Sequence, residues 1–170
     1  MRVRGFEPIT GRGARILILG SMPGVASLKA RQYYAHPQNA FWPIMGTLLG
    51  FDQSTPYERR KRALEGARIA VWDVLQSCER RGSLDTMIEN EVANDFNAFF
   101  RAHRGITHVF FNGAKAETSF RRHALPQMSA SPSYARLPST SPANAALPYR
   151  RKLAAWRVIL TPVRRQGSHR

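Results

Sequence analysis

The chain has 170 residues, of which 43% are hydrophobic, so it is long enough to fold as one domain around its own core. Its single cysteine, Cys78, excludes an internal disulfide and the usual zinc-binding spacings, and no apolar run reaches the ~18 residues that span a membrane. Twenty-six lysine and arginine residues against eleven acids give a net charge of +15, which favours nucleic acid or another polyanion as partner. We therefore expect a cytoplasmic monomer that needs no metal and no cofactor.

The acidic residues are unevenly spread along the chain. Only Glu7 precedes Asp52, and none follows Glu117. The segments 8–51 and 118–170 therefore carry no negative side chain, as expected of a surface that faces phosphates. Abundant arginine can equally reflect a genome of high G+C content, so charge alone leaves both explanations open.

The first half of the chain contains two expected strands and two expected helices. Residues 14–19 form a short apolar run ended by glycine, which suits a buried strand. A loop over 21–38 leads to residues 39–49, whose apolar side chains recur at helical spacing. Residues 56–66 open with proline and close with glycine, as a short helix does. Residues 69–75 form a second buried strand.

The second half continues this alternation. We expect strands over 107–111 and 134–137, and helices over 94–103 (with Asn94 as N-cap), 114–122 and 148–160. A basic, loosely held tail is expected over 161–170.

Alternating strands and helices predict an α/β fold, a three-layer α/β/α sandwich around a mainly parallel four-stranded sheet. Ligands bind such sheets at the carboxyl ends of the strands. Two loops follow expected strands and contain the Gly, Pro and Ser that allow close approach to a ligand. The first consists of residues 20–24 and 36–42, and the second of residues 137–144. We expect these two loops to form two sides of one site, with Asp73 and Asn112 beside them.

The two loops resemble the motifs of the uracil DNA glycosylase superfamily and, within it, the sixth family, the hypoxanthine (deoxyinosine) DNA glycosylases. Residues 20–24 resemble the first motif, 36–42 its catalytic and base-stacking continuation, and 137–144 the second, DNA-penetrating loop. Shorter similarities lie at 71–75, 82–85 and 110–113. The resemblance implies a uracil DNA glycosylase-like fold and a monofunctional base excision repair enzyme. It would act on damaged DNA, release hypoxanthine and leave an abasic site.

Asn39 is the expected catalytic residue. Hydrolysis of an N-glycosidic bond gives the sugar cationic character and releases a base anion, so it needs a positioned water and hydrogen-bond donors. The Asn39 amide can orient water through its oxygen and donate through its nitrogen, and the resemblance implies that it is catalytic. Asparagine is also a preferred helix N-cap, and Asn39 can serve in both roles.

A base inside a duplex must be flipped into a pocket and stacked on an aromatic face before an enzyme can act on it. Phe41 is the expected stacking residue, whereas Trp42 is expected in the core. Asn112 either reads the edge of the base, orders the pocket, or is a turn residue with left-handed backbone. Asp73 either accepts a hydrogen bond from a purine nitrogen, holds water, or caps a neighbouring loop.

The first loop supplies three further expected pocket residues, Ser21, Met22 and His36. The Ser21 hydroxyl either donates to a phosphate beside the flipped nucleotide or forms an ordinary turn. His36 can meet a phosphate or the base, with a side chain that changes charge near neutral pH.

In the second loop, Leu137 stands where much of the superfamily has a histidine. A leucine cannot stabilise a base anion, so that part of the mechanism is either missing or supplied by Asn39 and backbone N–H groups, and the substrate preference moves toward a deaminated purine. Ser139 is expected to donate to a phosphate or to form a turn. The residues expected to enter the minor groove as a wedge are Thr140, Ser141, Pro142, Ala143 and Asn144.

The sequence leaves alternatives open. Uracil, xanthine and G·U or T·G mismatches are other possible substrates, because the shape of the pocket decides between them. A non-catalytic nucleic-acid-binding module is an alternative of another class. A nucleotide-binding enzyme is disfavoured, because no dinucleotide or phosphate-loop glycine signature occurs. Lys29 and Lys115 lie near the motifs, but neither is placed as a Schiff-base lysine.

Overall fold

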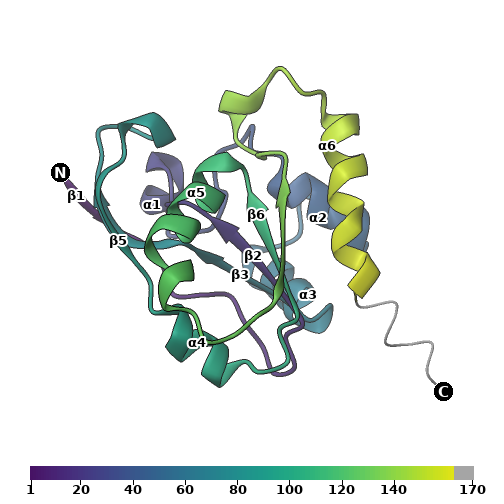
Figure 1. Ribbon diagram of the computed structural model, residues 1–170. Helices are drawn as coiled ribbons and strands as arrows, with labels where there is room; N and C mark the ends of the chain where they lie inside the picture. Colours follow the sequence, from purple (N-terminus) through teal and green to yellow (C-terminus); the bar gives the residue numbers. More distant parts are fainter. Residues whose placement is uncertain (163–170) are drawn as a thin grey trace.

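The computed structural model describes residues 1–162 and contains two sheets (Figure 1). The larger has four strands in the order β3 (Ile69–Asp73), β2 (Ile16–Gly20), β6 (His108–Asn112) and β7 (Ser133–Leu137). Every neighbouring pair is parallel. This confirms the α/β class and the four-stranded parallel sheet. Of the expected basic tail, residues 163–170 lie outside the described residues.

Helices cover both faces of this sheet. Buried side chains of α2 (Phe41–Leu49), α3 (Tyr57–Gly66) and α6 (Tyr149–Trp156) belong to a core on one face. Those of α4 (Phe96–Ala102) and α5 (Ala114–His123) belong to a second core on the other face. The arrangement is the three-layer sandwich that the alternation of elements predicts.

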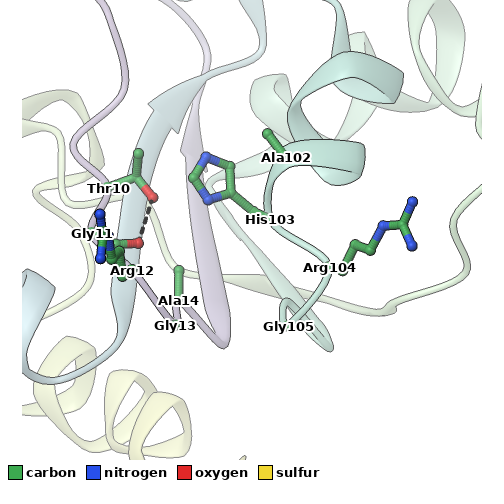
Figure 2. Close-up of a pocket in the computed structure, with 9 residues that line it drawn as sticks. All are labelled: Thr10, Gly11, Arg12, Gly13, Ala14, Ala102, His103, Arg104 and Gly105. Carbon is green, nitrogen blue, oxygen red and sulfur yellow. Dashed lines mark hydrogen bonds between the residues drawn. The ribbon is translucent and has the colours of Figure 1, made fainter.

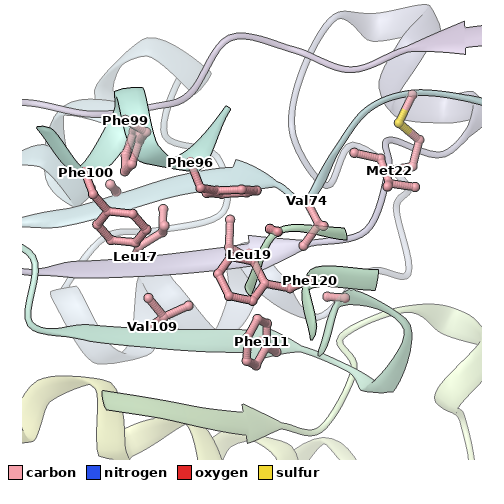
Figure 3. Packing of buried hydrophobic residues seen from close by; sticks show 14 of the residues in the cluster. Leu17, Leu19, Met22, Val74, Phe96, Phe99, Phe100, Val109, Phe111 and Phe120 are labelled. Carbon is pink, nitrogen blue, oxygen red and sulfur yellow. The ribbon is translucent and has the colours of Figure 1, made fainter. Parts of the chain in front are cut away.

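The central strand β2 separates the two cores. Ile16 and Ile18 point into the core beneath α2, whereas Leu17 and Leu19 point toward α4 and α5, and all four are fully buried. Figure 3 shows Leu17 and Leu19 among the phenylalanines of the α4 and α5 side. Because successive residues face opposite layers, a strand buried on both sides is apolar throughout.

Helix α2 begins directly after the expected catalytic loop. Phe41, Ile44 and Met45 are fully buried and lie at helical spacing on its inner face. Gly50 ends the helix in a left-handed conformation, with φ of 85°, and donates its N–H to the Gly46 carbonyl at 2.8 Å. This helix gives the loop before it a rigid support.

A second, antiparallel sheet was not expected from the sequence. It consists of β1 (Arg2–Arg4), β4 (Leu75–Glu79) and β5 (Glu89–Ala93), with β4 in the middle. The strand expected over 69–75 therefore ends at Asp73, and the chain continues from Leu75 into the other sheet. The edge strands of this second sheet, β1 and β5, are short and half-exposed. Their conformation is therefore determined by pairing with β4 rather than by an apolar pattern.

Two local expectations were wrong. The expected loop over 21–38 contains helix α1 (Val25–Ala30). The side chain that caps α4 is Asp95, which accepts from Ala98 N at 3.0 Å, whereas Asn94 donates to the Asp73 carbonyl at 2.8 Å. Both residue types are good N-caps, and Asn94 is used to hold the end of β3. Single 3₁₀ turns complete the fold: η1 (Asp85–Met87), η2 (Leu125–Gln127), η3 (Pro142–Asn144) and η4 (Arg157–Leu160).

Within residues 1–162, no helix has the length and apolar character needed to cross a membrane. The same residues contain no group of three His, Cys, Asp or Glu side chains arranged to hold a metal ion.

Candidate functional site

The expected site residues lie at the carboxyl ends of the parallel strands. Gly20 at the end of β2 pairs with Asp73 at the end of β3, and Asn112 at the end of β6 pairs with Leu137 at the end of β7. Adjacent parallel strands end on the same edge of a sheet, which is where α/β proteins bind ligands. The two loops singled out in the sequence therefore leave the same edge.

Hydrogen bonds join the first loop to the second. Ala40 N donates to the Thr140 carbonyl at 3.0 Å. Asn112 holds the same threonine twice, since its Nδ2 donates to Thr140 Oγ1 and its Oδ1 accepts from Thr140 N, both at 2.9 Å. The structure thus brings the two loops together at one site.

This geometry makes Asn112 an anchor for the second loop. Its oxygen and its nitrogen both bind Thr140, so it positions the second loop. The left-handed residue is the next one, Gly113, with φ of 92°. A Cβ on Gly113 would lie 2.9 Å from Ser139 Cβ, so only glycine allows the second loop to pack this closely on the end of β6.

Asn39 lies one residue before the N-cap of α2, which is Ala40. Its Oδ1 accepts from Phe41 N at 2.9 Å, and its backbone N–H donates to the His36 carbonyl at 2.9 Å. The capping interaction fixes the side chain at the beginning of a rigid helix. An amide oxygen accepts two hydrogen bonds, so Oδ1 can still accept from a water while it caps the helix.

His36 is exposed and shapes the turn that carries Asn39. Its Nδ1 accepts from Gln38 N at 3.1 Å. This interaction requires the proton of a neutral imidazole to be on Nε2, which leaves Nε2 as a donor for an external group.

The aromatic residues at the start of α2 are buried. Trp42 is a core residue, as expected, and its Nε1 donates to the Tyr33 carbonyl at 2.7 Å. Phe41 is fully buried, and the ring of Tyr34 stacks on it with a centroid distance of 4.1 Å and an interplanar angle of 29°. The face expected to receive a base is therefore covered by Tyr34, which the sequence reasoning missed. The only signal was an aromatic pair, Tyr33-Tyr34, inside the first loop.

Asp73 is a buried carboxyl group at the centre of the site. Burial, together with nearby Asp85, raises its pKa to about 7, although Arg80 opposes both effects. Its Oδ2 is buried without a hydrogen-bond partner, and its Oδ1 lies 2.5 Å from the position that a Cβ on Gly20 would take. A buried polar atom without a partner is costly, and such atoms cluster at binding and catalytic sites.

The segment 83–85, between β4 and β5, forms a third side of the site. Ser21 Oγ donates to Asp85 Oδ1 at 2.7 Å, and Ser83 Oγ accepts from Val25 N at 2.8 Å. Ser21 therefore uses its hydroxyl hydrogen within the protein, and a contact with phosphate requires the hydroxyl to rotate. Leu84, between the two contacts, is 56% exposed.

Two residues lie elsewhere than expected. Met22 is 7% exposed and belongs to the core on the α4 and α5 side, and Figure 3 shows it at the end of this core near Val74. In the DNA-free protein its side chain packs among core residues. Thr140 is 1% exposed and is fixed by Asn112, so it anchors the second loop and is not part of an exposed wedge.

The rest of the second loop is held by its own hydrogen bonds. Ser139 Oγ accepts from Ser141 N at 3.2 Å, and Asn144 Nδ2 donates to the Ser139 carbonyl at 3.1 Å. Ser141 Oγ caps the turn η3 by accepting from Ala143 N. The hydroxyl hydrogen of Ser139 remains available to donate outward. Ala143, at the tip, is exposed and small.

Two hollows of the described residues lie away from these loops. One, of about 480 Å³, is lined by segments 10–14 and 102–105, near the amino ends of β2 and β6 (Figure 2). The other, of about 520 Å³, lies between the second sheet and helices α4 and α5. Neither contains Asn39, Phe41, Asp73 or Asn112.

The chain is similar to proteins of one known family. The family model of the uracil DNA glycosylase superfamily matches residues 8–160. A hypoxanthine DNA glycosylase from Methanosarcina barkeri (strain Fusaro / DSM 804) is 40% identical over 117 residues, which are 68% of this chain and 74% of the relative. A protein of the same description from Methanosarcina acetivorans is 38% identical over 114 residues, covering 66% and 72% of the two chains.

A solved structure shows the same fold. The solution NMR structure of a proposed uracil DNA glycosylase from Methanosarcina acetivorans superposes with a TM-score of 0.81 at 33% identity. The alignment covers 94% of this chain and 97% of that one. With the family model matching residues 8–160, the chain belongs to the uracil DNA glycosylase superfamily.

Proposed function

We propose that the protein is a monofunctional DNA glycosylase of base excision repair that hydrolyses the bond between deoxyribose and hypoxanthine in deoxyinosine. The observation that carries this proposal is the position of Asn39. Its side chain is fixed at the start of helix α2, and the next residue, Ala40, is hydrogen-bonded to the second loop. The description of both Methanosarcina relatives as hypoxanthine DNA glycosylases supports the choice of base. We also propose that the chain acts as a single-domain monomer.

In this proposal Asn39 orients the attacking water through Oδ1. The water oxygen bonds to C1′ of the sugar while the bond from C1′ to N9 breaks, and N9 keeps the electron pair. The water gives up a proton, and the departing base takes one up. Leu137 is apolar and buried, so hydrogen bonds to the leaving base come from amide and backbone N–H donors rather than from a histidine.

Asp73 is the residue best suited to read the base. Hypoxanthine carries a hydrogen on N1, whereas N1 of adenine is an acceptor, so an ionised carboxylate favours the deaminated base. A pKa of about 7 means that the carboxylate form predominates above neutral pH. The unpartnered Oδ2 is a suitable acceptor for such a hydrogen.

Hydrolysis without a lyase step fits the positions of the lysines near the motifs. Lys115 forms an ion pair with Glu91 on strand β5, and Lys29 is exposed in the last turn of α1. A covalent adduct trapped with borohydride between the protein and inosine-containing DNA would contradict this part of the proposal.

The test is an alkaline-nicking assay on oligonucleotides that carry inosine, xanthine, uracil or a T·G mismatch. We expect inosine to be cut fastest. If uracil is cut much faster than inosine, the assignment of the base is wrong. If none is cut while the DNA is bound, the protein is a binding module that retains the fold.

A further inference from the structure

The segment 83–85, between β4 and β5, carries a carboxylate that the mechanism proposed above does not use. Asp85 Oδ1 accepts a hydrogen bond from Ser21 Oγ at 2.7 Å. Ser21 directly follows Gly20, the last residue of the central strand β2. The Asp85 carboxylate is therefore held beside the first loop, at the carboxyl edge of the sheet.

The backbone around Asp85 is fixed on both sides. Before it, Ser83 Oγ accepts from Val25 N at 2.8 Å, which ties the segment to the first loop a second time. After it, the Asp85 carbonyl accepts from Ile88 N at 3.2 Å, and Ile88 is a core residue with 8% exposure. The Asp85 side chain itself is exposed, and the hydrogen bond it makes within residues 1–162 uses Oδ1. Oδ2 can therefore face an incoming substrate.

Asp85 lies close to the buried Asp73 but in a different environment. Burial and, after it, the negative charge of Asp85 raise the pKa of Asp73. Gly20 pairs with Asp73 across the sheet and the next residue, Ser21, binds Asp85. Asp73 is 3% exposed, whereas Asp85 is exposed. Asp73 thus lies inside the protein at the strand ends, and Asp85 lies at the surface from which water enters.

Hydrolysis needs a group that takes the proton of the attacking water. The Asn39 amide can orient a water, but an amide is not a base. Neutral His36 accepts from Gln38 N through Nδ1 and carries its hydrogen on Nε2, so both of its ring nitrogens are in use. The segments 8–51 and 118–170, which contain the two loops, carry no acidic side chain. The proton acceptor must therefore come from another segment.

We propose that Asp85 is a catalytic residue, which takes the proton of the attacking water and stabilises the cationic sugar. The proposal rests on the proposed function, because it assigns one step of that hydrolysis. The water oxygen bonds to C1′, the bond from C1′ to N9 breaks with its electron pair on N9, and the water proton moves to Asp85. The released base then takes a proton from solvent, and Asp85 returns its proton to solvent. A carboxylate near the sugar also favours the positive charge that develops there.

Asp85→Asn tests the charge and keeps the contact with Ser21, because an amide oxygen also accepts a hydrogen bond. In single-turnover alkaline nicking, kcat for inosine DNA should fall about a hundredfold, as expected when a general base is lost. The Kd for the lesion duplex should change little. Asp52→Asn is the matched control, because Asp52 is also exposed and its Oδ1 accepts from Ser54 Oγ at 3.1 Å, but it lies beyond the far end of α2. This control should keep full kcat.

Selectivity separates the role of Asp85 from that of Asp73. Asp85 acts on the water, so Asp85→Asn should slow the cleavage of every base that the protein releases by the same factor. Asp73→Asn should instead change the ratio of rates between bases. If Asp85→Asn changes this ratio and keeps the kcat for inosine, Asp85 reads the base and the proposal is wrong.

Chemical rescue distinguishes a reacting carboxylate from one that only fastens the segment. Asp85→Ala removes the carboxylate, and added formate supplies a free one, so kcat of this variant should rise with formate concentration. Formate should not raise the kcat of Asn39→Ala, which retains Asp85. An Asp85→Asn variant with full kcat, or an Asp85→Ala variant that formate does not rescue, would show that Asp85 only holds the segment against Ser21.

The double variant Asn39→Ala/Asp85→Asn tests whether both residues act on one water. Its kcat should be close to that of Asn39→Ala alone, because residues that act as a unit are not additive. Losses that multiply would place Asp85 in a different step and overturn the assignment to the water. An unsubstituted protein that cuts no lesion would instead overturn the proposed function itself.

Discussion

The two loops at the carboxyl edge use their polar groups in different ways. In the first loop, Asn39 makes one capping interaction and keeps hydrogen-bonding capacity. In the second loop, Thr140, Ser141 and Asn144 direct their side chains to neighbouring groups of the protein. We propose from this difference that the first loop supplies reactive groups, whereas the second supplies a rigid shape.

The largest effect is expected for Asn39→Ala. In the proposed mechanism Asn39 orients the water, so kcat for inosine DNA should fall about a thousandfold, the size seen when one transition-state hydrogen-bonding group is removed. Affinity for the lesion duplex should change little, as measured by fluorescence anisotropy. Ser139→Ala in the second loop is the control and should reduce kcat far less. Equal losses from the two substitutions would abolish the distinction between the loops.

The shape of the second loop is tested by Gly113→Ala. The new Cβ would strain a residue with φ of 92° and collide with Ser139, and we expect about 1–3 kcal/mol of destabilisation with DNA binding at least tenfold weaker. Gly50→Ala is the matched control, because Gly50 has a similar φ of 85° but nothing within 4 Å of its Cβ position. It should lower Tm and leave DNA binding unchanged.

The Asp73 carboxyl group should make the selectivity for inosine over adenine depend on pH. The pKa of about 7 predicts that selectivity for inosine over adenine rises between pH 6 and 8, as the carboxylate form becomes dominant. Asp73→Asn should make the selectivity profile flat over this interval. A profile that is the same in both proteins would remove Asp73 from base reading.

The same pKa predicts an effect on stability. Since the folded protein binds the Asp73 proton more tightly than the unfolded chain, whose carboxyl has a pKa of 3.8, stability falls as the pH rises from about 4 to 7. Asp73→Asn carries no charge, so its Tm should exceed that of the native protein at pH 8. The difference between the two proteins should shrink toward pH 4. Thermal unfolding of both proteins between pH 4 and 8 measures this difference in Tm.

The smallest effect concerns phosphate contacts of the second loop. Ser139→Ala should weaken DNA binding only a few-fold, since it removes one neutral donor. If about four phosphates are neutralised elsewhere on the basic surface, log Kd should change with log salt with a slope of magnitude near 3.6. The Ser139 variant should keep this slope. A reduced slope would mean that the loop itself supplies charge.

Several features of the fold could be predicted from the sequence because they depend on local patterns. The apolar run that ends at Gly20 gave the central strand, and the spacing of Phe41, Ile44 and Met45 gave helix α2. The second sheet could not be predicted, since strands such as Glu89–Ala93 carry few apolar residues and form by pairing with β4.

The motifs likewise located the two loops and Asn39, but not the roles of their neighbours. Met22 and Thr140 have the residue types of a site, yet one packs in the core and the other is tied to Asn112. For Tyr34 the sequence offered only an aromatic pair inside the first loop, and the structure shows that its ring stacks on Phe41.

The sequence by itself determined the α/β class, the basic surface and the loop that carries Asn39, because composition, periodicity and motif spacing are properties of the chain. Only the tertiary structure decided which polar groups remain available for a substrate. That depends on contacts between segments far apart in the sequence, such as Asn112 with Thr140 and Gly20 with Asp73 and Tyr34. Burial then sets the pKa of Asp73, which no local pattern encodes.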